Sequence, residues 1–306
     1  PNIYKLAGKL SQIQTKIVAM GVGWKSISGD WGDCYSYSLS DSTLELLEVI
    51  ENSSYISSVR DLHTLTVLQS RGFKNFKLTG CPALFNLDFQ PEKIKKLDGK
   101  AKTVAFSLGV SFLKSEAMKR QMKELVMRLY HMCLSNSQDF KVVFHHSLDA
   151  KVVSSSSSST PHLLGHLNFL EWIKEKGIAH IDISGSAENL TNFYDEVDFH
   201  IGYRVHAHIY MCSLGKKSLL ISEDGRANSL QATIGGNIIK GYSNYKSNKV
   251  TRLLKLDPYT TVNNLNDVII ERLNYELKHG NQFTKQSVSN ISSLKESMLN
   301  FIAQLP

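Results

Sequence analysis

The sequence has few of the residues that hold small secreted or metal-stabilised domains together. Its 306 residues include only four cysteines (Cys34, Cys81, Cys133 and Cys212), which lie far apart and form no C-x-x-C pair. This spacing argues against a structural zinc site or a disulfide framework and favours a reducing compartment. No apolar run reaches the roughly 18 residues that a membrane helix needs, and the first residues do not form a signal peptide. An integral membrane segment is therefore not expected.

Signatures of several common protein classes are also missing. The net charge is +7, yet no run of five or more Lys or Arg exists and the aromatic residues are not interleaved with a basic stripe. Nucleic-acid binding is therefore not expected. The charge fits a basic cleft for a phosphorylated small molecule as well as an ordinary solvated surface. The absence of a P-loop, a G-x-S-x-G elbow and an H-E-x-x-H pair weakens the ATPase, hydrolase and zinc-protease interpretations.

Apolar runs and helical periodicities alternate along the chain, which favours parallel β-α units. Predicted strands cover 16–20, 55–59, 76–78, 103–107, 141–144, 178–183, 199–202 and 218–222. Predicted helices cover 43–50, 62–70, 116–133, 163–174, 262–277 and 289–305. We expect an α/β chain with two Rossmann-like domains facing across a cleft, where ligands bind at the carboxyl ends of strands.

Composition places the domain boundaries. The polar stretch 86–102 has no strong periodicity, so we assign 1–90 to an N-terminal domain, 91–102 to a linker and 103–285 to a C-terminal domain. Residues 286–306 form a final helix that could pack back on the first domain. The six serines Ser154–Ser159 predict a loop by their composition.

An Arg and two His stand at the start of an apolar helix that follows a short buried strand. Free backbone N–H groups and the positive end of the helix dipole suit an anionic ligand near Arg204. His208 lies four residues from Arg204 and shares its face, whereas His206 points away from both. His-x-His on a helix is a poor chelate, so no metal site is expected. An internal ion pair of Arg204 with Asp198 or Glu223 is the alternative.

A carboxylate pair follows the next buried strand, where active sites occur in α/β folds. Glu223 or Asp224 could act as general acid or base, while the other orients Arg226 or a sugar hydroxyl. Asp224 is also a candidate cap for a helix over 227–234, and both interpretations stay open.

Three further groups lie at predicted strand ends. His145 and His146 follow one strand, and Arg60 with a capping Asp61 follows another. The Gly21-Val22-Gly23 stretch is half of a dinucleotide fingerprint without its third glycine, and a tight strand-to-loop turn explains it better.

Four segments, in this order, resemble the polysaccharide pyruvyltransferase family. They are GVGW (21–24), SSVRDLHT (57–64), TGCPALF (79–85) and IGYRVHAH…EDGR (201–226). The resemblance implies a fold like that of GT-B glycosyltransferases, with the donor on the C-terminal side and the acceptor on the N-terminal side. It also implies transfer of pyruvate from phosphoenolpyruvate to two hydroxyls of one sugar, giving a ketal and free phosphate.

The resemblance also implies roles for the residues. Arg204 would bind the carboxylate or phosphate of phosphoenolpyruvate, and His206 would be the acid that protonates its methylene carbon. Glu223 or Asp224 would accept the proton of the attacking hydroxyl. The remaining candidates for substrate binding are His208, Arg226, His145, His146 and Arg60. Phosphoenolpyruvate is a co-substrate, so no cofactor is expected.

The chain departs from the family pattern in two places. Family members commonly have an Arg just after the strand that opens the second domain, where this chain has Ser107-Leu108-Gly109-Val110, and Lys114 is a candidate replacement. Only about 15 residues precede the G-x-G strand, where the family usually has another β-α unit, so the domain is trimmed or the chain is incomplete.

Two other functions remain open on the sequence alone: a GT-B-type glycosyltransferase that uses a nucleotide-sugar donor, and a non-catalytic glycan- or phosphate-binding relative, which the missing Arg would suit. For the pyruvyltransferase we expect a cytoplasmic enzyme of cell-surface polysaccharide synthesis. Its sugar acceptor could be nucleotide-, lipid- or glycan-linked, and a homo-oligomer stays open.

Overall fold

The computed structural model describes residues 10, 13–26, 28–85, 101–113, 115–149, 160–244 and 259–306. The predicted linker lies outside the described residues except for 101 and 102, and so do Lys114 and the serine run Ser154–Ser159.

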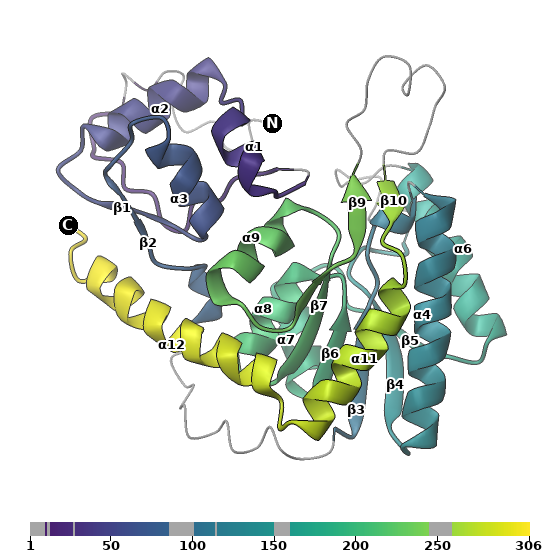
Figure 1. Cartoon of the computed structure of the whole chain (residues 1–306). Coiled ribbons are helices and arrows are strands. Elements are labelled where there is room, and N and C mark those ends of the chain that lie inside the picture. The colour runs from purple at the N-terminus through teal and green to yellow at the C-terminus, as the bar shows by residue number, and fades with distance from the viewer. Residues whose placement is uncertain are drawn as a thin grey trace.

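A six-stranded parallel sheet forms the centre of the larger part of the molecule (Figure 1). Its strands are β3 (Thr103–Ser107), β4 (Asp139–Phe144), β5 (Ala179–Asp182), β6 (Phe199–Gly202), β7 (Lys217–Ser222) and β8 (Ile238–Lys240). The spatial order is β5-β4-β3-β6-β7-β8. The chain thus builds outward from β3 to one side and then returns to β6 on the other. Such a reversal is a topological switch point, where open α/β sheets bind their ligands.

Helices cover both faces of this sheet. They are α4 (Glu116–Ser135), α6 (Thr160–Glu175), α7 (Ala187–Asp195), α8 (Val205–Ser213), α9 (Gly225–Ile234), α11 (Leu265–Lys278) and α12 (Gln282–Ile302). Side chains of β3 alternate between two cores: Phe106 packs with Leu129 of α4, and Ala105 packs with Met211 of α8. This alternation follows from the two-residue period of a strand.

The smaller, N-terminal part has its own parallel pairing. Strands β1 (Ser57–Val59) and β2 (Phe76–Leu78) pair in parallel, with α1 (Trp31–Ser36), α2 (Asp41–Glu51) and α3 (Leu62–Gln69) beside them. The predicted strand 16–20 reaches only a single parallel bridge, between Val22 and Val59. Gly21 breaks it with a φ of +66°. A Cβ at Gly21 would lie 2.6 Å from Cδ of Pro82, so the turn interpretation of G-x-G is confirmed.

The two parts meet along α8, α9 and α12. Leu84, in the short 3-10 helix η2 (Pro82–Leu84), packs with Leu230 of α9 and Ile291 of α12 in one apolar cluster. The indole N–H of Trp24 donates to Ser229 Oγ at 2.8 Å. The final helix therefore lies on the larger part and reaches the smaller one, as Figure 1 shows.

The predicted α/β class is confirmed, and most predicted elements occur within a few residues of their expected bounds. The final helix begins at Gln282, seven residues earlier than 289. Elements that were not predicted are α1, α7, β8 and the antiparallel pair β9 (Tyr242–Asn244) and β10 (Tyr259–Thr261), together with the short 3-10 helices η2 and η4 (Ser111–Leu113). Among the described residues, no helix is both long enough and apolar enough to cross a membrane.

Candidate functional site

A cavity of about 620 Å³ opens at the carboxyl ends of the central strands. It is lined by Val110, His145, His146, Ile183, Ser184, Gly185, Ser186, Ala187, Leu190, Tyr203, Arg204, Val205, His206, Glu223 and Arg226. These residues follow β3, β4, β5, β6 and β7 in turn, so the cavity spans the switch point between β3 and β6. The fold alone predicts a ligand site at this edge.

Arg204 is the N-cap residue of α8, so the helix begins one position after the predicted start at Arg204. Its backbone N–H donates to Ser107 Oγ at 3.0 Å, which fixes the helix start against the end of β3. Burial lowers the pKa of the guanidinium below its ordinary value, and the nearby Glu223 carboxylate opposes that shift. Among the described residues, none accepts a hydrogen bond or forms an ion pair with this guanidinium within 4 Å. The predicted partner Asp198 instead accepts from the backbone of Lys102 and Thr103.

Glu223 lies on the cavity wall and is held by backbone groups. Its Oε2 accepts from Val110 N at 2.8 Å and from Ser111 N at 2.9 Å. A Cβ on Gly109 would lie 2.5 Å from that oxygen, so only glycine fits at 109. This contact leaves no room for an anion-binding side chain at Gly109 itself.

Asp224 and Arg226 form a local unit at the start of α9. Asp224 is the N-cap residue and accepts from the Arg226 backbone N–H at 2.9 Å. The same carboxylate accepts two hydrogen bonds from the Arg226 guanidinium, at 2.9 and 2.6 Å, and these bonds raise the pKa of Arg226. The capping interpretation is confirmed. Asp224 is not among the cavity-lining residues, whereas Arg226 is.

His206 lies in the first turn of α8 and its side chain is exposed at the cavity. Loss of water around part of the ring lowers the pKa of His206. The nearby cations Arg226, Arg204 and Arg60 lower it further. The imidazole is therefore neutral near pH 7 in the empty protein. An anion bound between these cations would reverse that effect, because opposite charge favours the protonated ring.

His145 and His146 follow β4 and line the cavity, as their position at a strand end predicted. His145 Nε2 is hydrogen-bonded to the hydroxyl of Tyr194 at 2.9 Å. Burial holds the pKa of His145 well below its ordinary value, with further lowering by Arg204. His145 thus offers a neutral, oriented ring beside Arg204.

His208, a predicted substrate-binding residue, does not line the cavity. The side chain is fully buried, and its Nδ1 is hydrogen-bonded to Ser218 Oγ at 2.7 Å. Ser218 Oγ also bonds His200 Nδ1 at 2.8 Å, and His200 Nε2 bonds Ser107 Oγ at 2.7 Å. His208 shares a face of α8 with Arg204 but lies one helical turn further from the helix start, where its ring contacts Ser218 of β7. Burial lowers its pKa to about 3.

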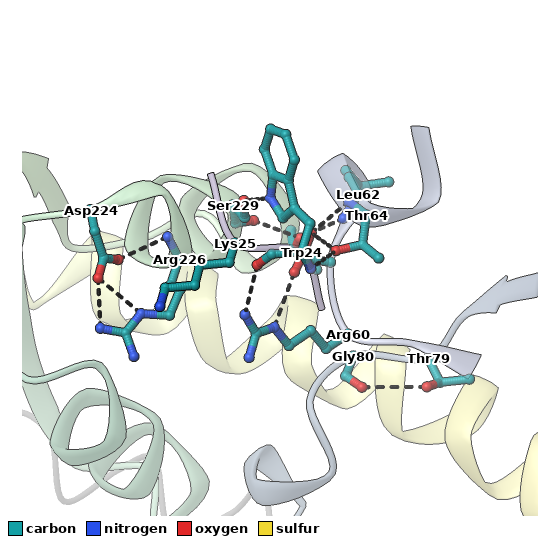
Figure 2. A network of polar contacts seen from close by, with 12 residues as sticks. Trp24, Lys25, Arg60, Leu62, Thr64, Thr79, Gly80, Asp224, Arg226 and Ser229 are labelled. Carbon is teal, nitrogen blue, oxygen red and sulfur yellow. Dashed lines mark hydrogen bonds and ion pairs between the residues drawn. The ribbon is translucent and has the colours of Figure 1, made fainter. Parts of the chain in front are cut away.

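Arg60 is not among the cavity-lining residues, and its guanidinium is directed toward the backbone of Trp24 (Figure 2). Its guanidinium donates to Asp61 at 3.2 Å and to the carbonyl of Trp24 at 3.4 Å. Asp61 caps α3 by accepting from the Thr64 N–H. Arg60 affects the site electrostatically, because its positive charge helps to lower the pKa of His206.

Sequence reasoning missed the loop 183–187 and the start of α7. This loop supplies a third of the cavity-lining residues, and Ser186 caps α7 by accepting from Asn189 N. The available signal was the Ser-Gly-Ser stretch directly after a predicted strand, since that position lies at the ligand-binding edge. Among the described residues, no group of three or more His, Cys, Asp or Glu could hold a metal ion.

The cavity thus combines two guanidinium groups, three imidazoles and one anchored carboxylate at two helix N-termini. This arrangement is chemically suited to an anion and to proton transfer at His206 or Glu223.

Two solved structures are among those that match this chain, both with low sequence identity and low TM-scores. The S. aureus MnaA structure with UDP is 12% identical, with a TM-score of 0.42, and the match covers 91% of this chain and 66% of that one. A UDP-GlcNAc 2-epimerase from Neisseria meningitidis bound to UDP-GlcNAc is 11% identical, with a TM-score of 0.43, and the match covers 83% and 63%. The chain therefore spans less than two thirds of the length of these proteins. No curated protein matches the chain.

A family comparison goes further than these structures. The profile described as polysaccharide pyruvyl transferase matches residues 2–225. That range includes the four resembling segments except for the last residue, Arg226, and ends at the first residue of α9. It covers well over half of the 306 residues, so the chain belongs to the polysaccharide pyruvyl transferase family.

Proposed function

We propose that the protein transfers pyruvate from phosphoenolpyruvate to two hydroxyls of one sugar, forming a ketal and releasing phosphate. Family membership supports the transferase class. The observation that carries the donor assignment is the Arg204 guanidinium, which lies at the cavity without an acceptor among the described residues. A cation in this position needs an anion to offset its loss of water. Phosphoenolpyruvate carries a carboxylate and a phosphate on one small scaffold.

Donor binding in this proposal uses both guanidinium groups. Arg204 binds the carboxylate or the phosphate, assisted by the free N–H groups at the start of α8. Arg226, oriented by Asp224, supplies a second cation at the same cavity. It offsets the absence of an Arg after β3, where the Glu223 carboxylate occupies the space beside Gly109. Phosphoenolpyruvate acts as co-substrate, and the reaction as proposed requires no cofactor.

His206 is the proposed acid. The bound anion raises the pKa of His206, so that the ring takes up a proton as the donor binds. It then transfers that proton to the methylene carbon, which leaves an oxocarbenium-like centre at the carbon that bears the carboxylate. A sugar hydroxyl attacks this centre and forms the first C–O bond. The second hydroxyl then displaces phosphate and closes the ketal.

Glu223 is the better candidate for the base that accepts the proton of the first attacking hydroxyl, while the proton of the second leaves with the departing phosphate. Glu223 lines the cavity, and its Oε1 accepts no hydrogen bond from the described residues. Asp224 has both oxygens committed to Arg226. We therefore assign proton transfer to Glu223 and the orientation of Arg226 to Asp224.

The acceptor remains a class: a sugar that is nucleotide-, lipid- or glycan-linked and belongs to a cell-surface polysaccharide or its precursor. A cytoplasmic location and homo-oligomerisation are part of the same proposal, as predictions from the sequence.

Titration calorimetry of phosphoenolpyruvate tests the donor assignment. Saturable binding to the wild type that Arg204→Ala abolishes is the expected result, because the variant removes the cation that the anion neutralises. Arg128→Ala is the control, since Arg128 lies on α4 and pairs with Glu124 and Asp267 away from the cavity. UDP- and CMP-sugars are titrated in parallel. Their binding without phosphoenolpyruvate binding would favour a glycosyltransferase, and near-normal donor affinity in Arg204→Ala would refute the assignment.

A further inference from the structure

Three aromatic rings stack at the surface of the smaller part of the molecule. The His63 ring lies nearly parallel to Trp24, with centroids 5.6 Å apart, and nearly parallel to Trp31, with centroids 3.9 Å apart. His63 is 2% exposed, and neither of its ring nitrogens has a hydrogen-bond partner among the described residues. His63 therefore acts through the faces of its ring, and it holds the Trp31 indole in one orientation.

The outer ring of this stack is open to solvent. Trp31 is 49% exposed, which is what remains when one face of an indole is covered and the other is free. A large apolar ring that is rigid and half exposed is ready to bind at little cost in side-chain entropy. Tyr35, one turn further along α1, is 70% exposed and extends the same aromatic surface.

This surface is attached to the edge of the sheet that carries the cavity. Asp30, the residue before Trp31, pairs with the ammonium group of Lys240 at the end of β8, at 2.9 Å. The Ser28 carbonyl accepts from Asn228 of α9 and from the Tyr242 hydroxyl. Asn228 lies two residues from Arg226, which lines the cavity.

The polar groups beside Trp31 are also exposed. The side chains of Asp30 and Lys240 are 60% and 44% exposed, so they can exchange their mutual contact for a ligand. A carboxylate and an ammonium next to an open indole face match a pyranose ring, which has an apolar C–H face and hydroxyls at its rim. A purely apolar partner would remove water from this charged pair and offer it no hydrogen bonds in exchange.

We propose that Trp31 is the stacking platform for a pyranose ring of the sugar acceptor, with Asp30 and Lys240 bonding its hydroxyls. The inference rests on the proposed function for the identity of the acceptor, and it locates acceptor recognition on α1 beside β8. The donor cavity holds phosphoenolpyruvate, and the neighbouring residues of the glycan extend across Trp31. Trp31 thus selects the acceptor and takes no part in the proton transfers.

Saturation-transfer NMR with methyl glycosides of the common hexoses and N-acetylhexosamines tests the platform. At least one glycoside is expected to receive saturation, strongest on the C–H protons of one ring face. Trp31→Ala should weaken its affinity about tenfold, the effect of losing roughly 1.4 kcal/mol of stacking, and Trp31→Phe should restore part of it. Tyr275→Ala is the matched control. Tyr275 of α11 is also a half-exposed aromatic residue, 40% exposed, that stacks on a histidine, His279, which follows this helix.

The same variants separate this inference from the donor assignment. Phosphoenolpyruvate affinity measured by calorimetry should be equal in Trp31→Ala and the wild type. Glycoside binding that Trp31→Ala removes would support the platform even if the wild type binds no phosphoenolpyruvate. No saturation transfer to any glycoside, or equal transfer in wild type and Trp31→Ala, would overturn it. Loss of saturation in Tyr275→Ala as well as in Trp31→Ala would also count against a specific platform.

Discussion

Two sets of histidines near the carboxyl edge of the central sheet have different environments. His206 and the pair at the end of β4 line the cavity, beside two guanidinium groups. His200 and His208 are fully buried beneath it, in a chain of hydrogen bonds through Ser218. All five follow or lie in a strand or the helix after it, so residue type alone does not separate them. What separates them is position. The first set lines the cavity at the carboxyl ends of the strands, and the second set is buried where α8 packs against the sheet.

The comparison also shows how the buried set serves the exposed set. His200 bonds Ser107, whose hydroxyl accepts from the backbone N–H of Arg204. This chain of hydrogen bonds therefore reaches Arg204, the N-cap residue of α8, without entering the cavity. We infer that the cavity histidines act on ligand, while the buried histidines fix the helix start that presents Arg204.

The largest effect should come from His206→Gln. Glutamine keeps the size and polarity but cannot transfer a proton, so turnover should fall at least about 100-fold, the usual contribution of a general acid. The free energy of unfolding should change by less than about 0.5 kcal/mol, because the side chain is exposed. Phosphate release from phosphoenolpyruvate in the presence of an acceptor, together with urea unfolding, measures both. A variant with unchanged turnover would remove His206 from the proposed chemistry.

His208→Ala should show the reverse pattern. Removal of a buried ring that bonds Ser218 leaves a cavity and an unpaired hydroxyl, so stability should fall by about 2–4 kcal/mol. Phosphoenolpyruvate affinity should change less than about threefold, because the ring lies outside the cavity. Urea unfolding and calorimetry on the same samples decide. Loss of donor binding at unchanged stability would return His208 to the site.

The smallest predicted difference between variants is in the slope of stability against pH. His200 and His208 are neutral in the folded protein because burial holds their pKa values far below 6.5. Below pH 6.5 the unfolded chain therefore binds more protons, and stability falls as the pH falls, by up to about 1.4 kcal/mol per pH unit for each ring. Urea unfolding between pH 7.5 and 5 measures the slope. In His208→Ala the slope should be shallower by that amount, and an unchanged slope would show that His208 titrates normally.

Much of this fold follows from local sequence pattern. The strands β2, β3 and β6 coincide with their predictions, because short apolar runs bounded by turn residues leave little choice of register. The N-terminal strand 16–20 did not form, because Gly21 adopts a positive φ and interrupts the extended backbone, so that the one β-bridge among the described residues of this segment lies after it, at Val22. The helices α1 and α7 were missed because they are short and polar, and α7 depends on Ser186 as its cap.

The site was predictable where a residue follows a strand directly. His145, His146, Arg204 and Glu223 were found in this way, since parallel strands end at one edge. Roles set by packing were only partly predictable. The anchoring of Glu223 depends on the space left by Gly109, and the sequence left open which of the two acids orients Arg226, a choice that the cap geometry of α9 gives to Asp224. The family match supports the transferase class that the four segments indicated.

The most direct test of the account is a crystal structure of the protein soaked with phosphoenolpyruvate. The account predicts density in the cavity at the ends of β3 and β6, with an anionic group of the ligand within hydrogen-bond distance of Arg204. The ring of His206 should lie against the methylene carbon. Density for the ligand at any other place, or an Arg204 guanidinium without contact to it, would contradict the central claim.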